Sequence, residues 1–143
     1  MGLNRKIRRI SALLKKAYGK PRAFHKSDAV DELVRTVLSQ NTTDKNSLKA
    51  FAVLKKNFKS WEMVLKKDTR SIARLIRHAG LSNIKANRIK GILAEIKERE
   101  GRISLASLKN MRVSDALSYL ESLKGVGPKT ASCVMLFSFG RPV

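Results

Sequence analysis

Apolar residues recur at three- and four-residue spacing in every long segment of the chain, and this periodicity most constrains the fold. One segment carries Val30, Leu33, Val34, Val37 and Leu38 on a single broad face of a helix. No run alternates convincingly with period two, as a half-buried strand would. We therefore predict an all-α fold, specifically an orthogonal multi-helix bundle.

Residues that start and stop helices separate these segments. Three segments follow polar residues that can cap a helix N-terminus: Ser27 or Asp28, Thr43 or Asp44, and Ser114 or Asp115. The segment from Ser82 to Gly101 is predicted to present an apolar face of Ile84, Ile89, Ile92, Leu93 and Ile96. At 143 residues, the chain is long enough for one core and is predicted to form one domain.

The net charge points to a polyanionic partner. The chain has 31 Lys and Arg against 11 Asp and Glu, which gives a net charge of +20. Self-repulsion of this size destabilises a compact state unless a polyanion or salt screens it, so nucleic acid is the leading candidate partner. A ribosomal or generally basic protein is the alternative on charge alone.

Cysteine and histidine give no indication of a metal site. Cys133 is the single cysteine, which excludes an internal disulfide framework and a multi-cysteine metal centre, and its apolar neighbours predict a buried thiol. His25 and His78 have no partners at metal-ligand spacing. We assign no metal ligand in this chain.

Nothing in the sequence indicates a membrane protein. No stretch approaches the roughly 20 apolar residues that span a bilayer, and the N-terminus lacks the apolar segment of a secretory signal. We expect an intracellular location, in the cytoplasm or nucleoid.

The stretch "LKGVGPKTA" is typical of a helix, a tight turn and a second helix. Gly125 and Gly127 allow positive φ angles, and Pro128 suits the first helical position. The unpaired N–H groups of the new helix form an anion site, for which a backbone phosphate is the obvious ligand. Lys129 could simply contact that phosphate.

Three stretches together resemble the endonuclease III branch of the helix-hairpin-helix DNA glycosylases, the HhH-GPD superfamily. The hairpin "LKGVGPKTA" is joined by "LVRTVLSQNTTDKNSLKAF" and "HAGLSNIKANRIKGI", in the family's order over roughly residues 27–142. The resemblance implies a six-helix barrel-like part at 27–143 with a hairpin at 117–137. It also implies a base-excision-repair DNA glycosylase with AP lyase activity, whose partner is double-stranded DNA containing damaged bases or abasic sites.

By this resemblance Lys129 is the catalytic nucleophile, which would attack C1′ of the damaged nucleotide and form a Schiff base. The reaction requires a neutral amine, although a free lysine is protonated at neutral pH. The positive end of a helix, a neighbouring cation such as Lys124 and partial desolvation would all disfavour the charged form.

The resemblance also implies a set of DNA-contacting residues. Gln40 or Asn41 would fill the space left by the flipped nucleotide, with Gln40 preferred for its reach, and Leu81 would wedge from the opposite side. Helix-end chemistry explains these residue types equally well. Lys85 and Arg88 could touch phosphate or be solvated surface. The remaining DNA contacts are assigned to the hairpin: Lys124, Gly125, Val126, Gly127 and Thr130.

The family pattern continues beyond "FGRPV" with a Val-Asp-Thr-His-like stretch and, in many members, four cysteines that hold a four-iron, four-sulfur cluster. Neither is present, so we expect no cofactor in this chain and a truncated or fragmentary glycosylase. The helix at 3–18 would belong to the incomplete second subdomain. Its Ile7, Ile10 and Leu14 should be exposed or should mediate self-association.

Three hypotheses remain open: a truncated DNA glycosylase/lyase, a non-enzymatic helix-hairpin-helix DNA-binding module, and a basic scaffold or RNA-associated protein. The lesion recognised is not encoded in these motifs.

Overall fold

The computed structural model describes residues 2–21 and 26–143, and their backbone forms helices and turns with no strand. The absence of strands among these residues confirms the all-α prediction. His25 lies outside the described residues. The α-helices are α1 (Leu3–Tyr18), α2 (Ala29–Ser39), α3 (Asp44–Asn57), α4 (Trp61–Lys66), α5 (Thr69–Leu75), α6 (Ser82–Glu100), α7 (Val113–Ser122) and α8 (Pro128–Phe139). Two 3₁₀ helices, η1 (Arg77–Ala79) and η2 (Ala106–Asn110), lie between them.

The described part of residues 27–143 contains the seven α-helices α2 to α8. Helix α4 stops after six residues, and Asp68 starts a new helix. The Asp68 carboxylate accepts from the backbone N–H of Ser71 at 2.8 Å, which fixes the beginning of α5.

Side-chain caps set the first two predicted helix starts but not the third. Asp28 caps α2, accepting from the N–H groups of Val30 and Asp31, and Thr43 caps α3. The expected cap of α7 by Ser114 or Asp115 is wrong, because α7 already begins at Val113. The Asp115 carboxylate instead pairs with the Arg112 guanidinium at 2.8 Å.

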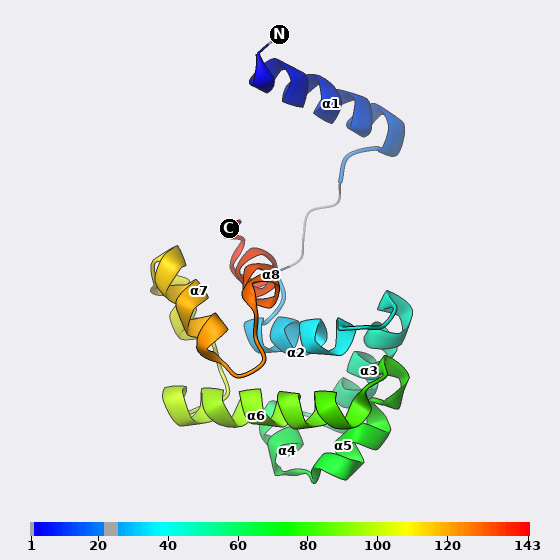
Figure 1. Ribbon diagram of the computed structural model, residues 1–143, viewed down its shortest axis with the longest axis vertical. Coiled ribbons are helices and arrows are strands. Elements are labelled where there is room, and N and C mark those ends of the chain that lie inside the picture. The colour runs from blue at the N-terminus through cyan, green and yellow to red at the C-terminus, as the bar shows by residue number, and fades with distance from the viewer. Residues whose placement is uncertain (1, 22–25) are drawn as a thin grey trace.

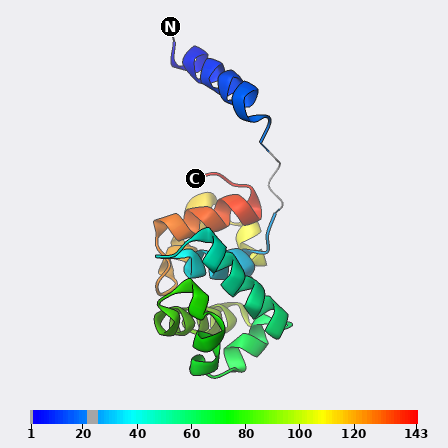
Figure 2. The same cartoon turned by 90° about the vertical axis from the view of Figure 1, so that its right-hand side faces the viewer.

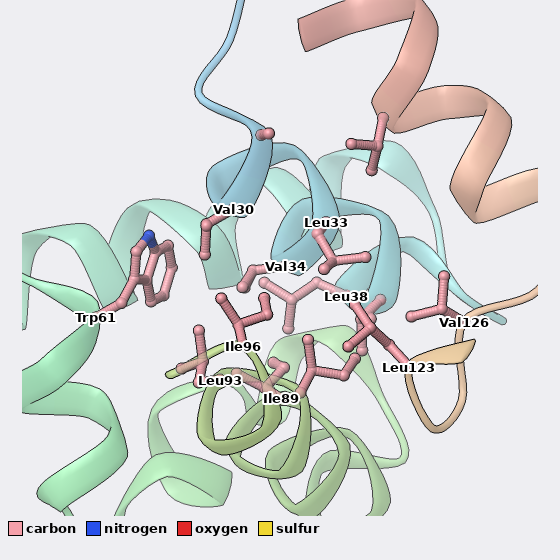
Figure 3. Packing of buried hydrophobic residues seen from close by; sticks show 14 of the residues in the cluster. Val30, Leu33, Val34, Leu38, Trp61, Ile89, Leu93, Ile96, Leu123 and Val126 are labelled. Atoms are coloured by element: carbon pink, nitrogen blue, oxygen red, sulfur yellow. The ribbon is translucent and has the colours of Figure 1, made fainter. Parts of the chain in front are cut away.

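The core surrounds α2, which packs against α3, α6 and α8 (Figure 1). Figure 3 shows side chains of α2 and α6 meeting there, with Leu123 and Val126 reaching in from the hairpin that precedes α8. Leu33, Leu38, Ile89 and Leu93 are fully buried. The hairpin is thus fixed to the core at the end of α2.

Helix α1 lies apart from this bundle in both views (Figures 1 and 2). None of its residues is buried. Ile7, Ile10 and Leu14 are 54%, 56% and 53% exposed, which confirms the predicted exposure of this apolar stripe.

Cys133 is half-buried, so the prediction of a buried thiol is wrong.

Within the residues that the structure describes, no helix combines the length and apolar character needed to cross a membrane.

Candidate functional site

A cavity of about 490 Å³ joins the loop after α2 to the start of α8. These two segments lie almost 90 residues apart in sequence but are brought together because α2 packs on α8. The lining residues are Thr36, Ser39, Gln40, Asn41, Gly127, Pro128, Lys129 and Thr130. The cavity therefore brings together five residues that the sequence motifs predict: the nucleophile candidate Lys129, the two gap-filling candidates Gln40 and Asn41, and the hairpin residues Gly127 and Thr130.

The start of α8 presents Lys129 to solvent at the edge of this cavity. Pro128 occupies the first turn, and Gly127 stands at the N-cap position without a side chain to satisfy the helix N–H groups. Lys129 is exposed. This helix end therefore offers free backbone donors next to an exposed amine, which suits an anionic ligand.

The two hairpin glycines differ in conformation. Gly125 has φ +86°, in the region that favours glycine, as expected. Gly127 has φ −100° and ψ 178°, an extended conformation open to any residue, so the expectation of a positive φ there is not met. A Cβ at Gly127 would meet no atom within 4 Å, so the fold itself does not require glycine at this position.

The loop after α2 holds its two amide side chains differently. Gln40 is half-buried, and its Oε1 accepts a hydrogen bond from Arg88 Nη1 at 2.6 Å. Asn41 is exposed and has φ +52°, a left-handed conformation that asparagine tolerates better than most residues. The protein thus fixes the side chain of Gln40 and uses Asn41 to turn the backbone.

Leu81 lies on a second left-handed turn, between η1 and α6. Its φ is +46°, and its side chain is 53% exposed. A large apolar side chain in a strained conformation at the surface is costly for folding alone. Its position is compatible with the predicted wedge role, although it does not line the cavity of Lys129.

The prediction that Lys85 touches phosphate is wrong. Its side chain is 1% exposed, and Nζ donates to the carbonyl oxygens of Leu38 at 2.8 Å and Ala79 at 2.6 Å. Burial lowers the pKa of the Lys85 ammonium group from its ordinary value. Lys85 joins the end of α2 to η1 inside the protein.

Two hairpin residues assigned to DNA contact also have buried side chains. Val126 and Thr130 are both only 6% exposed, so each offers little surface to a ligand, although Thr130 lines the Lys129 cavity. Lys124 is exposed, while its backbone N–H donates to Glu95 Oε2 at 3.3 Å. The exposed positive charges of the hairpin are therefore those of Lys124 and Lys129.

The HhH-GPD family model, described as a superfamily of base excision DNA repair proteins, matches residues 34–134. The chain belongs to this family. The matched range contains the Gln40 loop and the start of α8, and hence the residues that line the cavity.

Relatives and solved structures of HhH-GPD proteins agree with this assignment. A protein of Arabidopsis thaliana with the provisional name DNA glycosylase At3g47830 is 45% identical over 109 residues. Endonuclease III of Thermotoga maritima is 34% identical over 122 residues. A non-covalent endonuclease III–DNA complex shares the fold with a TM-score of 0.75 at 22% identity, and aligns with 98% of this chain and 62% of that chain. A thermostable thymine-DNA glycosylase gives a TM-score of 0.74 at 26% identity, with 98% and 63% covered.

The chain spans only part of these curated relatives. The alignment with the Arabidopsis protein covers 76% of this chain and 37% of that protein, and the alignment with the Thermotoga enzyme covers 85% and 53%.

The iron–sulfur cluster of many HhH-GPD enzymes does not fit the ligands of this chain. Such a cluster is held by four cysteine thiolates, whereas this sequence contains Cys133 alone. Among the described residues, no group of three His, Cys, Asp or Glu side chains could hold a metal ion.

Proposed function

We propose that this chain is a DNA-repair glycosylase domain that acts on damaged or abasic nucleotides through Lys129. The observation that carries the proposal is the 490 Å³ cavity, in which Lys129 and the α8 N-terminus lie beside Gln40 and Asn41. Family membership supplies the chemical class, and the net charge of +20 suits a nucleic-acid duplex.

The start of α8 would anchor the backbone of the duplex. Its free N–H groups and the exposed Lys124 offer donors and positive charge to a phosphate, without contact to the bases. This contact would place a flipped nucleotide close to Lys129.

Gln40 and Leu81 would occupy the duplex on either side of the extruded nucleotide. Extrusion costs stacking and pairing energy, which side chains inserted from the protein can offset. Gln40 is preferred to Asn41 for this role because its side chain is held in place by Arg88, whereas Asn41 serves the backbone turn.

The covalent step would use the Lys129 amine as the nucleophile. At an abasic site, Nζ adds to the C1′ aldehyde of the open sugar, and loss of water gives a Schiff base. Removal of a C2′ proton then expels the 3′ phosphate by β-elimination. At an intact damaged nucleotide Nζ would instead substitute at C1′ and expel the base, which takes up a proton. Cleavage of the C1′–O4′ bond, with a proton going to O4′, would then give the same Schiff base.

One observation favours a second candidate function, a DNA-binding module without catalysis. Among the described residues that line the Lys129 cavity, none is an aspartate or glutamate. A missing general acid or base lowers rates by about 10² to 10⁴-fold. The same DNA-binding surface would remain in this case.

Borohydride trapping separates the two functions. We expect incubation with abasic duplex and borohydride to give a covalent protein–DNA adduct that Lys129→Ala abolishes. Lys124→Ala is the matched control, because it removes an exposed hairpin cation and should weaken binding while the adduct still forms at saturating DNA. Binding without a Lys129-dependent adduct would support the binding module and exclude the lyase.

A further inference from the structure

We infer that Arg88 is a positioning residue that holds the Gln40 side chain ready for insertion into damaged DNA, an inference that rests on the proposed role of Gln40. Arg88 lies in the second turn of α6, 48 residues from Gln40. The sequence predicts for it only a phosphate contact or solvated surface.

The contact between the two side chains is short and charge-assisted. Arg88 Nη1 donates to Gln40 Oε1 at 2.6 Å in a half-buried setting. Hydrogen bonds with one ionised partner are shorter and about twice as strong as neutral ones. Partial burial also strengthens the bond, since less water competes for the two groups.

This bond also fixes which end of the amide faces Arg88. A guanidinium group can only donate, so the amide must present its oxygen, and the Nε2 donor group is left for another partner. Gln40 would therefore meet the unpaired base of the opposite strand mainly as a hydrogen-bond donor. All four bases offer an acceptor, so the expected effect is on damage discrimination and not on strict base preference.

The hairpin holds the other side of the Arg88 side chain. A Cβ built on Gly125 would lie 2.7 Å from Arg88 Nε and 2.9 Å from Arg88 Cδ, so Arg88 rests directly against the glycine backbone. Gly125 and Arg88, together with Lys124, line a hollow of about 600 Å³. Arg88 therefore ties the Gln40 loop to the turn that carries Lys129.

A side chain held in this way loses less conformational freedom when it enters the duplex. Glutamine is among the side chains with the largest rotamer entropy, so its immobilisation before binding favours binding. Removal of the Arg88 donors should weaken recognition of a nucleotide gap, which Gln40 fills, more than binding to intact duplex, which it does not enter.

A double-mutant cycle tests this inference. The affinities of wild type, Arg88→Met, Gln40→Ala and the double variant are measured for a duplex with a tetrahydrofuran abasic-site analogue and for the same undamaged duplex. We expect Arg88→Met to reduce the ratio of the two affinities about five- to tenfold, and to have no further effect once Gln40 is alanine. Lys97→Met, which removes one exposed charge from the same helix, should leave the ratio unchanged.

Other outcomes overturn the inference in recognisable ways. Equal losses on both duplexes, with a smaller salt dependence, would make Arg88 a phosphate contact. Additive losses in the double variant, or no effect of Gln40→Ala, would also exclude action through Gln40. If circular dichroism shows that Arg88→Met folds poorly, Arg88→Lys is measured instead, because lysine keeps one donor at similar reach. This variant should lose less than half of the logarithm of the affinity ratio between the two duplexes.

The borohydride experiment keeps this inference distinct from the proposed function. Absence of a Lys129-dependent adduct in the wild-type chain would refute the lyase activity, while the affinities of the double-mutant cycle could still be measured. A failed cycle with an intact adduct would refute the role of Arg88 alone.

Discussion

Replacement of Lys85 by methionine should destabilise the protein, although a buried lysine is ordinarily a cost to folding. Methionine keeps an unbranched side chain of similar volume but removes the ammonium group. Lys85 Nζ donates to the carbonyls of Leu38 and Ala79, and no backbone N–H of the described residues donates to either oxygen. The substitution therefore leaves two carbonyls without the donor that they have in the wild type.

The expected loss is about 2 kcal/mol. Each buried carbonyl left without a donor costs about 1 to 3 kcal/mol. The variant also no longer holds an ammonium group out of water, which offsets part of this cost and places the net value at the lower end. Urea unfolding at neutral pH, followed by circular dichroism, measures the difference, with Lys97→Met as an exposed control on α6.

The pH dependence gives a second and independent test. Because burial lowers the pKa of Lys85, the folded chain releases this proton at a lower pH than the unfolded chain, whose lysine keeps its ordinary pKa of 10.5. Between these two pKa values the unfolded state binds more protons, so stability rises with pH. The advantage of wild type over Lys85→Met should thus be constant at lower pH and increase as the pH approaches 10.5.

Either of two results would refute this reasoning. A methionine variant as stable as wild type would mean that the two carbonyl bonds do not offset the burial of the ammonium group. Parallel pH profiles of wild type and variant would mean that folding does not lower the pKa of Lys85.

Two further predictions concern the hairpin and helix α1. Gly125→Ala should destabilise the protein by about 1 to 2 kcal/mol, because φ is +86° and the new Cβ would meet Arg88. Gly91→Ala inside α6 meets no atom within 4 Å and should stabilise the protein by about 0.5 to 1 kcal/mol. Thermal unfolding compares the two variants, and equal effects on stability would contradict a strained turn at Gly125. The exposed apolar stripe of α1 should drive concentration-dependent self-association of the chain. Sedimentation equilibrium in high salt should show weaker association for the Ile7→Ser, Ile10→Ser double variant. A wild-type chain that stays monomeric at every concentration would rule out this association.

The elements of the fold could be predicted because their signals are local. Asp28 and Thr43 act as caps as predicted, and helical periodicity identified the face of α2 that reaches the core. The predicted cap of α7 is wrong because the helix begins at Val113, which places Ser114 and Asp115 inside its first turn.

The burial of Lys85 does not follow from its residue type, but it does follow from its position in α6. The apolar pattern predicts Ile84 on the buried face, yet Ile84 is 54% exposed. Lys85 lies one turn before Ile89 and two turns before Ile92, and both of these isoleucines are buried. The face that reaches the core therefore begins at Lys85, and this spacing was visible in the sequence. Its acceptors, which lie up to 47 residues away, were not.

The cations near the candidate site fall into two groups with different expected effects. On successive turns of α6, Lys85 donates to Leu38 at the end of α2, and Arg88 donates to Gln40 in the loop that follows. Lys124 and Lys129, on the hairpin, are exposed. A contact with a DNA phosphate responds to ionic strength, whereas an internal hydrogen bond does not. We therefore expect loss of the Arg88–Gln40 bond to alter discrimination between damaged and intact duplex at constant salt dependence. Loss of the Lys124 or Lys129 charge should instead lower the affinity for both duplexes and reduce its salt dependence.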